Sequence, residues 1–168
     1  LRRRQRQMCI RDRYIHIPFC VRKCNYCDFL SFPADEDTQR QYVKALCKEI
    51  FYYGAHCRDY VVSTVYIGGG TPSWLWESDM AEIMDAVHKN FALLPDAEVS
   101  VECNPGTVTA QKFAVYRQSG INRISLGLQS AQNVELKMLG RIHTWEQFLK
   151  TYELARAGGF SNINVDLM

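Results

Sequence analysis

Runs typical of buried β-strands alternate five times with segments of helical periodicity, and this alternation limits the possible folds of the chain most strongly. The strand-like runs cover residues 14–19, 61–67, 97–103, 123–128 and 162–168. Apolar periodicity with capping and stop residues predicts helices over 35–53, 78–91, 109–120, 130–139 and 145–157. Because strand–helix repeats build a parallel sheet with right-handed crossovers, the sequence predicts an α/β fold.

Single residues set several of the predicted helix boundaries. Gly54 is expected to end the first helix, and Ser78 or Asp79 to cap the second. Ser130 is expected to cap the fourth helix. The second helix carries a core-facing stripe of Met80, Ile83, Met84, Val87 and Phe91, and the last helix is expected to turn Phe148, Leu149 and Tyr152 inward.

Polar or glycine-rich residues stand at the carboxyl end of every predicted strand. In βα barrels, ligand sites are built at that face of the sheet. The sequence therefore predicts one shared site there. In chain order, its candidate residues are the cysteines of residues 20–27, the glycines of residues 68–70, Glu102 with Asn104, Gln129 and Asp166.

Cys20, Cys24 and Cys27 fall within eight residues, at the spacing CxxxCxxC. Thiolates are soft ligands, and three on one loop can converge on a metal centre. A 4Fe–4S cluster held by only three cysteines would leave one iron open to a substrate. Two alternatives remain, namely a zinc site completed by His16, and thiols that are buried or paired in a disulfide.

The glycines of residues 68–70 precede a Thr71-Pro72 corner. Glycines permit a ligand to lie against bare backbone, but they also permit a tight turn with positive φ. A phosphate-binding P-loop is excluded because no Lys-Ser or Lys-Thr follows.

The overall charge of +2 is set by the first thirteen residues, which contain six arginines and one aspartate. Subtracting these from the chain's 20 basic and 18 acidic residues leaves a net charge of −3. A mildly acidic body argues against a nucleic-acid partner. We expect residues 1–13 to be a foreign or disordered Arg-rich leader, and residues 14–168 to form the folded domain.

Seven cysteines, three of them clustered, favour intracellular metal chemistry over a secreted disulfide framework. No apolar run approaches the roughly 20 residues of a membrane span. A cytoplasmic location is expected. Cys9, Cys47, Cys57 and Cys103, and the isolated histidines His56, His88 and His143, are given no role in the site.

The cysteine motif, with Tyr26 before its last cysteine and the run of residues 14–19 before its first, resembles the cluster loop of the radical S-adenosylmethionine (SAM) superfamily. The similarity covers residues 14–168 and is greatest to the branch of oxygen-independent coproporphyrinogen III oxidase and the haem chaperones of the HemW type. It implies a partial TIM-like (βα)6 radical SAM barrel with about five βα units present. The sixth strand and a C-terminal domain would be missing, so an N-terminal fragment is expected.

The resemblance also implies two cofactors and their contacts. A 4Fe–4S cluster would be held by Cys20, Cys24 and Cys27, and SAM would bind the open iron. The implied contacts near SAM and the cluster are Tyr14, Tyr26, Gly69, Gly70, Thr71, Glu102, Gln129, Arg141 and Asp166.

Phe29 separates the two members of this branch. The oxidase has a further cysteine two residues after the third cluster cysteine, whereas this chain continues Cys27-Asp28-Phe29. The resemblance therefore implies a haem chaperone, with haem bound through the missing C-terminal part. Its implied partners are haem or porphyrin, a haem-acceptor protein and an electron donor. Coproporphyrinogen III oxidase and a zinc-stapled structural module are the alternatives.

Overall fold

One parallel sheet organises the protein. The computed structural model describes residues 9–168. In this part of the chain the strands are β1 (Cys9–Ile17), β2 (Tyr60–Gly69), β3 (Ala92–Cys103), β4 (Arg123–Gln129) and β5 (Asn162–Leu167). They are hydrogen-bonded in sequence order and every neighbouring pair is parallel. This arrangement confirms the predicted α/β fold, with five parallel strands as expected for a partial TIM-like barrel.

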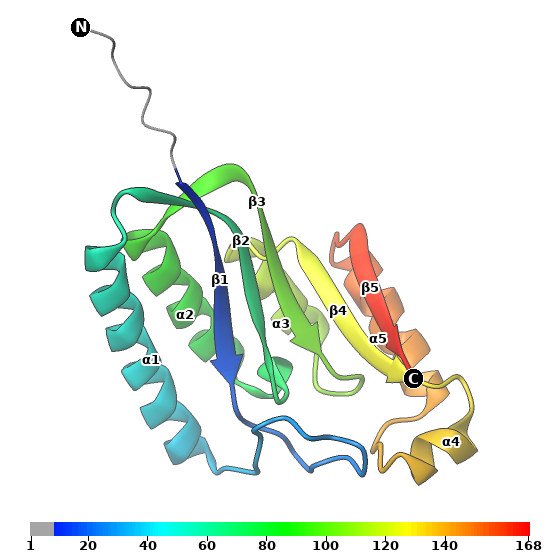
Figure 1. Cartoon of the computed structure of the whole chain (residues 1–168). Helices are drawn as coiled ribbons and strands as arrows, with labels where there is room; N and C mark the ends of the chain where they lie inside the picture. Colours follow the sequence, from blue (N-terminus) through cyan, green and yellow to red (C-terminus); the bar gives the residue numbers. More distant parts are fainter. Residues whose placement is uncertain (1–8) are drawn as a thin grey trace, which may run out of the picture.

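The helices form the crossovers between these strands. They are α1 (Glu36–His56), the 3-10 turn η1 (Pro72–Trp74), α2 (Glu77–Asn90), α3 (Ala110–Gln118), α4 (Asn133–Met138) and α5 (Trp145–Ala157). The strand arrowheads in Figure 1 point to the same edge of the sheet, along which the loop of residues 18–35 runs toward α4. None of the helices between residues 9 and 168 has the length and apolar character that a membrane crossing requires.

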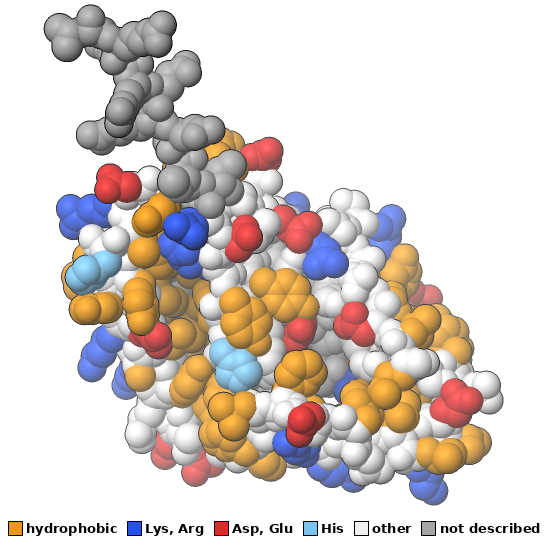
Figure 2. All heavy atoms as spheres, in the orientation of Figure 1, with side chains coloured by type: hydrophobic (Ala, Val, Ile, Leu, Met, Phe, Trp, Pro, Cys, Tyr) orange, Lys and Arg blue, Asp and Glu red, His pale blue; other side chains and the backbone are white. Residues whose placement is uncertain are grey.

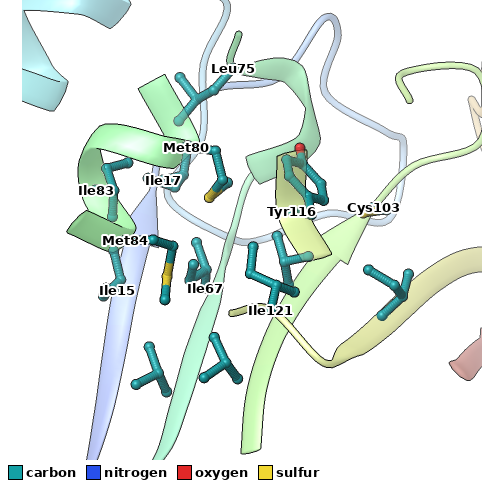
Figure 3. Packing of buried hydrophobic residues seen from close by; sticks show 14 of the residues in the cluster. Ile15, Ile17, Ile67, Leu75, Met80, Ile83, Met84, Cys103, Tyr116 and Ile121 are labelled. Carbon is teal, nitrogen blue, oxygen red and sulfur yellow. The ribbon is translucent and has the colours of Figure 1, made fainter. Parts of the chain in front are cut away.

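The core lies between the sheet and the helices. Ile15, Ile17 and Ile67 of the strands are buried against the helices, as Figure 3 shows. The predicted stripe of α2 is confirmed for Met80, Ile83, Met84 and Val87, which are buried, whereas Phe91 is half-buried at the C-cap.

Helix α1 corrects one predicted boundary. Asp35 is its N-cap and accepts a hydrogen bond from the Thr38 amide at 2.8 Å. Gly54 does not end the helix, which continues to His56. A Cβ added at Gly54 would lie 2.6 Å from Asn90 Cβ and 2.6 Å from the Asn90 carbonyl oxygen. Gly54 therefore allows α1 to pack closely against the end of α2.

We expect Gly54→Ala to destabilise the protein although alanine is the better helix former. Helix propensity favours alanine by about 1 kcal/mol. Overpacking against Asn90 costs about 1–3 kcal/mol, so packing should prevail. Urea unfolding should show a lower free energy of unfolding than wild type, while the exposed control Lys44→Ala should change it by less than about 0.5 kcal/mol. A stabilised Gly54→Ala would contradict this packing argument.

The predicted cap of α2 is wrong. Trp76 occupies the N-cap without a side-chain hydrogen bond, and Ser78 and Asp79 lie within the helix. Asp79 is buried and forms an ion pair with Arg40 of α1, which also lies 2.9 Å from Glu82. The Asp79 carboxylate thus joins two helices instead of capping one.

Two predictions on the later helices are corrected, and two are confirmed. Gln132 is the N-cap of α4, and the Ser130 hydroxyl instead accepts from the Gln132 amide at 3.0 Å. In α5 Phe148 is buried, but Leu149 and Tyr152 are exposed because the buried face passes through Phe148, Thr151 and Ala155. The Thr109 cap of α3 and the bounds of α5 are confirmed.

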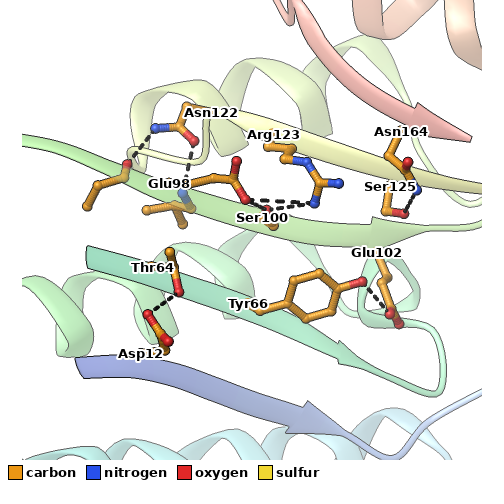
Figure 4. Close-up of polar contacts among 12 residues, drawn as sticks. Asp12, Thr64, Tyr66, Glu98, Ser100, Glu102, Asn122, Arg123, Ser125 and Asn164 are labelled. Carbon is orange, nitrogen blue, oxygen red and sulfur yellow. Dashed lines mark hydrogen bonds and ion pairs between the residues drawn. The ribbon is translucent and has the colours of Figure 1, made fainter. Parts of the chain in front are cut away.

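Strand β1 begins five residues before its predicted start. Residues 1–8 of the expected leader lie outside the described part, but residues 9–13 pair with β2. Arg11 lies over the Tyr60 ring at 4.8 Å, and Arg13 over the Phe91 ring at 4.6 Å. The Asp12 carboxylate accepts a hydrogen bond from Thr64 at 2.8 Å, which Figure 4 shows. These contacts accommodate charged residues in a strand; the foreign origin of the leader stays a prediction.

Candidate functional site

A cavity of about 320 Å³ lies at the carboxyl edge of the sheet. Every predicted cluster or SAM contact except Tyr14 lines it, although these residues come from segments that are far apart in the sequence. They are Cys20, Cys24, Tyr26, Cys27, Gly69, Gly70, Thr71, Glu102, Gln129, Arg141 and Asp166.

The cysteine loop is fixed at both ends by hydrogen bonds. The Cys20 amide donates to the Phe32 carbonyl at 3.1 Å. The Asn25 amide and side chain donate to the carbonyls of Leu139 and Met138, at 3.0 and 2.8 Å. Arg22 donates to the Gly140 carbonyl at 2.8 Å. The residues between the cysteines therefore bind the loop to α4 and the turn that follows it.

The three thiols are free, as are the other cysteines whose side chains are described. Cys20 Sγ lies 3.4 Å from the Thr71 hydroxyl, and Cys24 Sγ lies 3.6 Å from Arg141 Nη1. Within residues 9–168, no three His, Cys, Asp or Glu side chains are close enough to share a single ion. A four-iron cluster can take each thiolate on a different iron, so the three cysteines fit that group better than a mononuclear site.

His16 does not complete a zinc site in this geometry. Its Nδ1 lies 3.0 Å from the Tyr14 hydroxyl, and its Nε2 lies 3.0 Å from the Leu30 carbonyl oxygen. Both ring nitrogens are therefore engaged, and His16 is not among the residues that line the cavity. The zinc alternative with His16 as fourth ligand is not supported.

The corner formed by Gly69 and Gly70 at the end of β2 supports the cysteine loop. Gly69 has φ 119°, which favours glycine, and its amide donates to Glu102 Oε2 at 3.1 Å. The Gly70 amide donates to the Ile17 carbonyl at 2.8 Å. A Cβ added at Gly70 would lie 2.6 Å from the Phe19 carbonyl oxygen and 3.0 Å from Cys20 Sγ. Gly70 is therefore required for the close approach of the Cys20 backbone and thiol.

Two carboxylates lie in the same cavity. Glu102 accepts from the Tyr66 hydroxyl at 2.7 Å, and Figure 4 shows these side chains pointing toward each other. Burial raises the pKa of Glu102, and the hydrogen bonds from Tyr66 and Gly69 oppose that shift. Asp166 accepts from Ser125 at 3.0 Å and from Asn164 at 2.7 Å. A cationic ligand group would find two oriented carboxylate partners here.

Arg141 lies in the segment after α4, and its guanidinium reaches Cys24 of the cysteine loop. Its Nη2 donates to Asn104 Oδ1 at 2.7 Å and to the Gly127 carbonyl at 2.8 Å. Asn104 in turn donates to the Thr71 hydroxyl at 2.9 Å. Asn104 was placed at a strand end by the sequence but was given no contact. Its position two residues after Glu102 is the signal that could have identified it.

Tyr14 and Gln129 occupy contrasting positions. Tyr14 does not line the cavity; it is 60% exposed, and its ring stacks on Tyr66 with the centroids 6.2 Å apart. Gln129 lines the cavity with φ 72°, a conformation uncommon for a residue with a side chain. Backbone of this kind is concentrated at functional sites.

His143 contacts Arg141 from outside the cavity, although no role was predicted for it. It is buried, with 4% exposure. Its Nε2 lies 3.2 Å from the Leu128 carbonyl oxygen, and its Nδ1 lies 3.3 Å from Arg141 Nε. Burial, together with the Arg141 charge, lowers the pKa of His143 to about 4. Its position two residues after Arg141 is the sequence feature that could have identified this contact.

This pKa predicts a pH dependence of stability. The unfolded chain binds a proton at His143 below about pH 6.5, whereas the folded protein does so only near pH 4. The free energy of unfolding should therefore fall as the pH drops from about 6.5 to 4, by at most about 1.4 kcal/mol per pH unit. Urea unfolding of wild type and of the non-titrating His143→Asn variant isolates this contribution from the carboxyl groups. Equal pH slopes for the two proteins would contradict the assigned shift.

Comparison with known proteins gives concordant matches. The family model of the radical SAM superfamily matches residues 14–168. The haem chaperone HemW of Escherichia coli K12 is 42% identical over 92% of this chain and 41% of its own length. HemW of Bacillus subtilis 168 is 35% identical over 95% of this chain and 42% of its own length. The chain thus spans about two fifths of the length of these curated relatives.

Among solved structures, coproporphyrinogen III oxidase (HemN) from Escherichia coli, described as a radical SAM enzyme, superposes with a TM-score of 0.87. Its sequence identity is 29%, over 95% of this chain and 37% of that one. A structure of anSMEcpe with AdoMet and a peptide bound has a TM-score of 0.66 at 13% identity, which shows a shared fold alone. On the family match and these relatives, the chain belongs to the radical SAM superfamily, in its branch of HemW-like and HemN-like proteins.

Proposed function

We propose that this protein binds a 4Fe–4S cluster and SAM at the carboxyl edge of its sheet, and that it is a haem chaperone which transfers haem to acceptor proteins. The observation that carries the first part is the shared cavity, in which three free cysteines face an arginine and two carboxylates. The second part rests on the HemW relatives and on Phe29.

Each side chain in the cavity has a separate task in this proposal. Cys20, Cys24 and Cys27 hold the cluster, which, when bound, supplies the electron for reductive cleavage of SAM. Glu102 is placed to accept hydrogen bonds from a cationic amino group, and Arg141 to donate to a carboxylate. Asp166 offers its carboxylate oxygens to paired ribose hydroxyls.

Phe29 favours the chaperone over the oxidase. It is 67% exposed and lines the cavity at the position where the oxidase carries an additional cysteine. A phenyl ring supplies no thiol there, so this chain departs from the pattern of the oxidase at that position. Coproporphyrinogen III oxidase remains the second candidate, because HemN shares the fold at a TM-score of 0.87.

An anaerobic assay separates the two candidates. The full-length protein is incubated with a reductant, SAM and coproporphyrinogen III, and in parallel with haem. We expect no protoporphyrinogen and a stable protein–haem complex that passes its haem to an acceptor. Formation of protoporphyrinogen would overturn the chaperone proposal, whereas failure to bind either haem or SAM would overturn both candidates.

A further inference from the structure

The donors of Arg141 are divided between the scaffold and the cavity. A guanidinium has five N–H groups and accepts no hydrogen bond. Three of these groups bind the scaffold: Nε–H donates to His143 Nδ1 at 3.3 Å, and the two on Nη2 donate to Asn104 Oδ1 and the Gly127 carbonyl at 2.7 and 2.8 Å. The Nη1 group makes only long contacts, donating to Cys24 Sγ at 3.6 Å and to the Tyr26 hydroxyl at 3.5 Å, and both of these residues line the cavity. One edge of the guanidinium is therefore anchored, and the Nη1 corner is presented to the cavity.

The chemistry of these contacts fixes the tautomer of His143. Because Arg141 can only donate, Nδ1 of His143 must be unprotonated to accept from Nε. A neutral imidazole then carries its proton on Nε2, which matches the Leu128 carbonyl oxygen 3.2 Å away. Burial lowers the pKa of His143 to about 4, so the ring is neutral at neutral pH and its Nδ1 stays free to accept.

Asn104 anchors the other side of the guanidinium. Its Oδ1 accepts from Arg141, while its own amide donates to the Ser73 hydroxyl at 3.1 Å and its Nδ2 to the Thr71 hydroxyl at 2.9 Å. The Thr71 hydroxyl donates to Cys20 Sγ at 3.4 Å. A continuous series of hydrogen bonds thus joins Arg141 to one cluster-loop cysteine.

We infer that His143 is a positioning residue, which by accepting from Arg141 Nε and donating to the Leu128 carbonyl holds the guanidinium with Nη1 toward the ligand carboxylate. Without this acceptor, Nε–H of Arg141 would lose its partner in a partly buried setting, and the side chain would sample other rotamers. The ligand would then have to order Arg141 on binding, which lowers its affinity. The SAM part of this inference rests on the proposed function, whereas the hydrogen bond itself does not.

Two substitutions separate the two contacts of the imidazole. In His143→Asn the amide oxygen stands as many bonds from Cα as Nδ1 does, so it can still accept from Arg141. In His143→Gln the amide nitrogen stands as far along the chain as Nε2, so it can still donate to Leu128 but leaves Arg141 Nε without an acceptor. His88→Gln is the matched control, because His88 Nε2 also lies near a backbone carbonyl, that of Ser119 at 3.1 Å, outside the cavity.

The first measurement is the NMR signal of Arg141 Nε–H in protein free of SAM. The signal should be resolved and slow to exchange in wild type, His143→Asn and His88→Gln, and should exchange about tenfold faster in His143→Gln, as loss of one hydrogen bond implies. Fast exchange in wild type, or no difference between the Asn and Gln variants, would overturn the inference whether or not SAM binds.

The second measurement is SAM affinity of the cluster-loaded proteins, with folding checked by circular dichroism. His143→Gln should bind on the order of tenfold more weakly than wild type, and His143→Asn should restore binding to within about threefold. If well-folded His143→Gln bound SAM with wild-type affinity, or if both variants bound SAM equally weakly, the inference would be wrong and His143 would serve only in packing. Absence of SAM binding by wild type would instead contradict the proposed function and leave the NMR result to decide on His143.

Discussion

Replacing Cys20, Cys24 and Cys27 together by alanine is expected to abolish iron binding. Anaerobic reconstitution of wild type should give about four irons per chain with broad brown absorbance, and the triple variant should retain almost none. The reason is that the triple variant lacks all three thiols that the cysteine loop contributes to the cavity. The remaining cavity cysteine, Cys103, is buried, and burial raises the pKa of its thiol to about 12, which makes it a poor replacement ligand.

Cys47→Ala and Cys57→Ala are the matched controls for this experiment. Both cysteines are free and half-buried, and neither lines the cavity. Each control should bind as much iron and sulfide as wild type. Full iron content in the triple variant, or equal losses in the controls, would show that the cluster is held elsewhere.

Gly70→Ala is expected to reduce both the stability of the protein and its iron content. The added methyl group would lie 2.6 Å from the Phe19 carbonyl oxygen and 3.0 Å from Cys20 Sγ, so the backbone or the thiol must move. Overpacking of this kind costs about 1–3 kcal/mol of unfolding free energy. Moving Cys20 also misplaces one cluster ligand, so the folded fraction should bind less iron than wild type. Urea unfolding and iron analysis of the folded fraction measure the two effects.

Gly158→Ala provides the comparison for Gly70→Ala. Gly158 follows α5 with φ −73°, a conformation that alanine adopts readily, and a Cβ there would come no closer than 3.2 Å to its neighbours. It should leave iron content unchanged. If Gly70→Ala were as stable as wild type and bound a full complement of iron, the corner would not constrain Cys20.

The sequence predicted the fold because its strongest signals are local. Alternating strand and helix periodicity identified all five strands and the helices between them, and the apolar stripe of α2 identified a buried face. The errors arose where tertiary contacts override local preference. Gly54 stays helical because α1 packs on Asn90, and Arg11 and Arg13 enter β1 because aromatic rings lie beneath them.

The location of the site was predictable from the sequence, as the fold was. Strand ends of a parallel sheet must meet at one edge, which places Glu102 and Gln129 in one cavity without knowledge of their contacts. The supporting residues were not predictable, because their roles depend on side-chain directions. Asn104 contacts Arg141, 37 positions away in the sequence, and His143 acts through two specific ring nitrogens. Tyr14 does not line the cavity although it lies close to the motif in the sequence.

The electron paramagnetic resonance spectrum of the reduced, reconstituted protein, recorded with and without SAM, tests the central claim most directly. Three cysteines would leave one iron of a four-iron cluster without a protein ligand, and Arg141 and Glu102 line the same cavity as these cysteines. The account predicts a 4Fe–4S signal whose g values shift when SAM is added. A spectrum that SAM leaves unchanged, or a protein that retains zinc and no iron or sulfide, would contradict it.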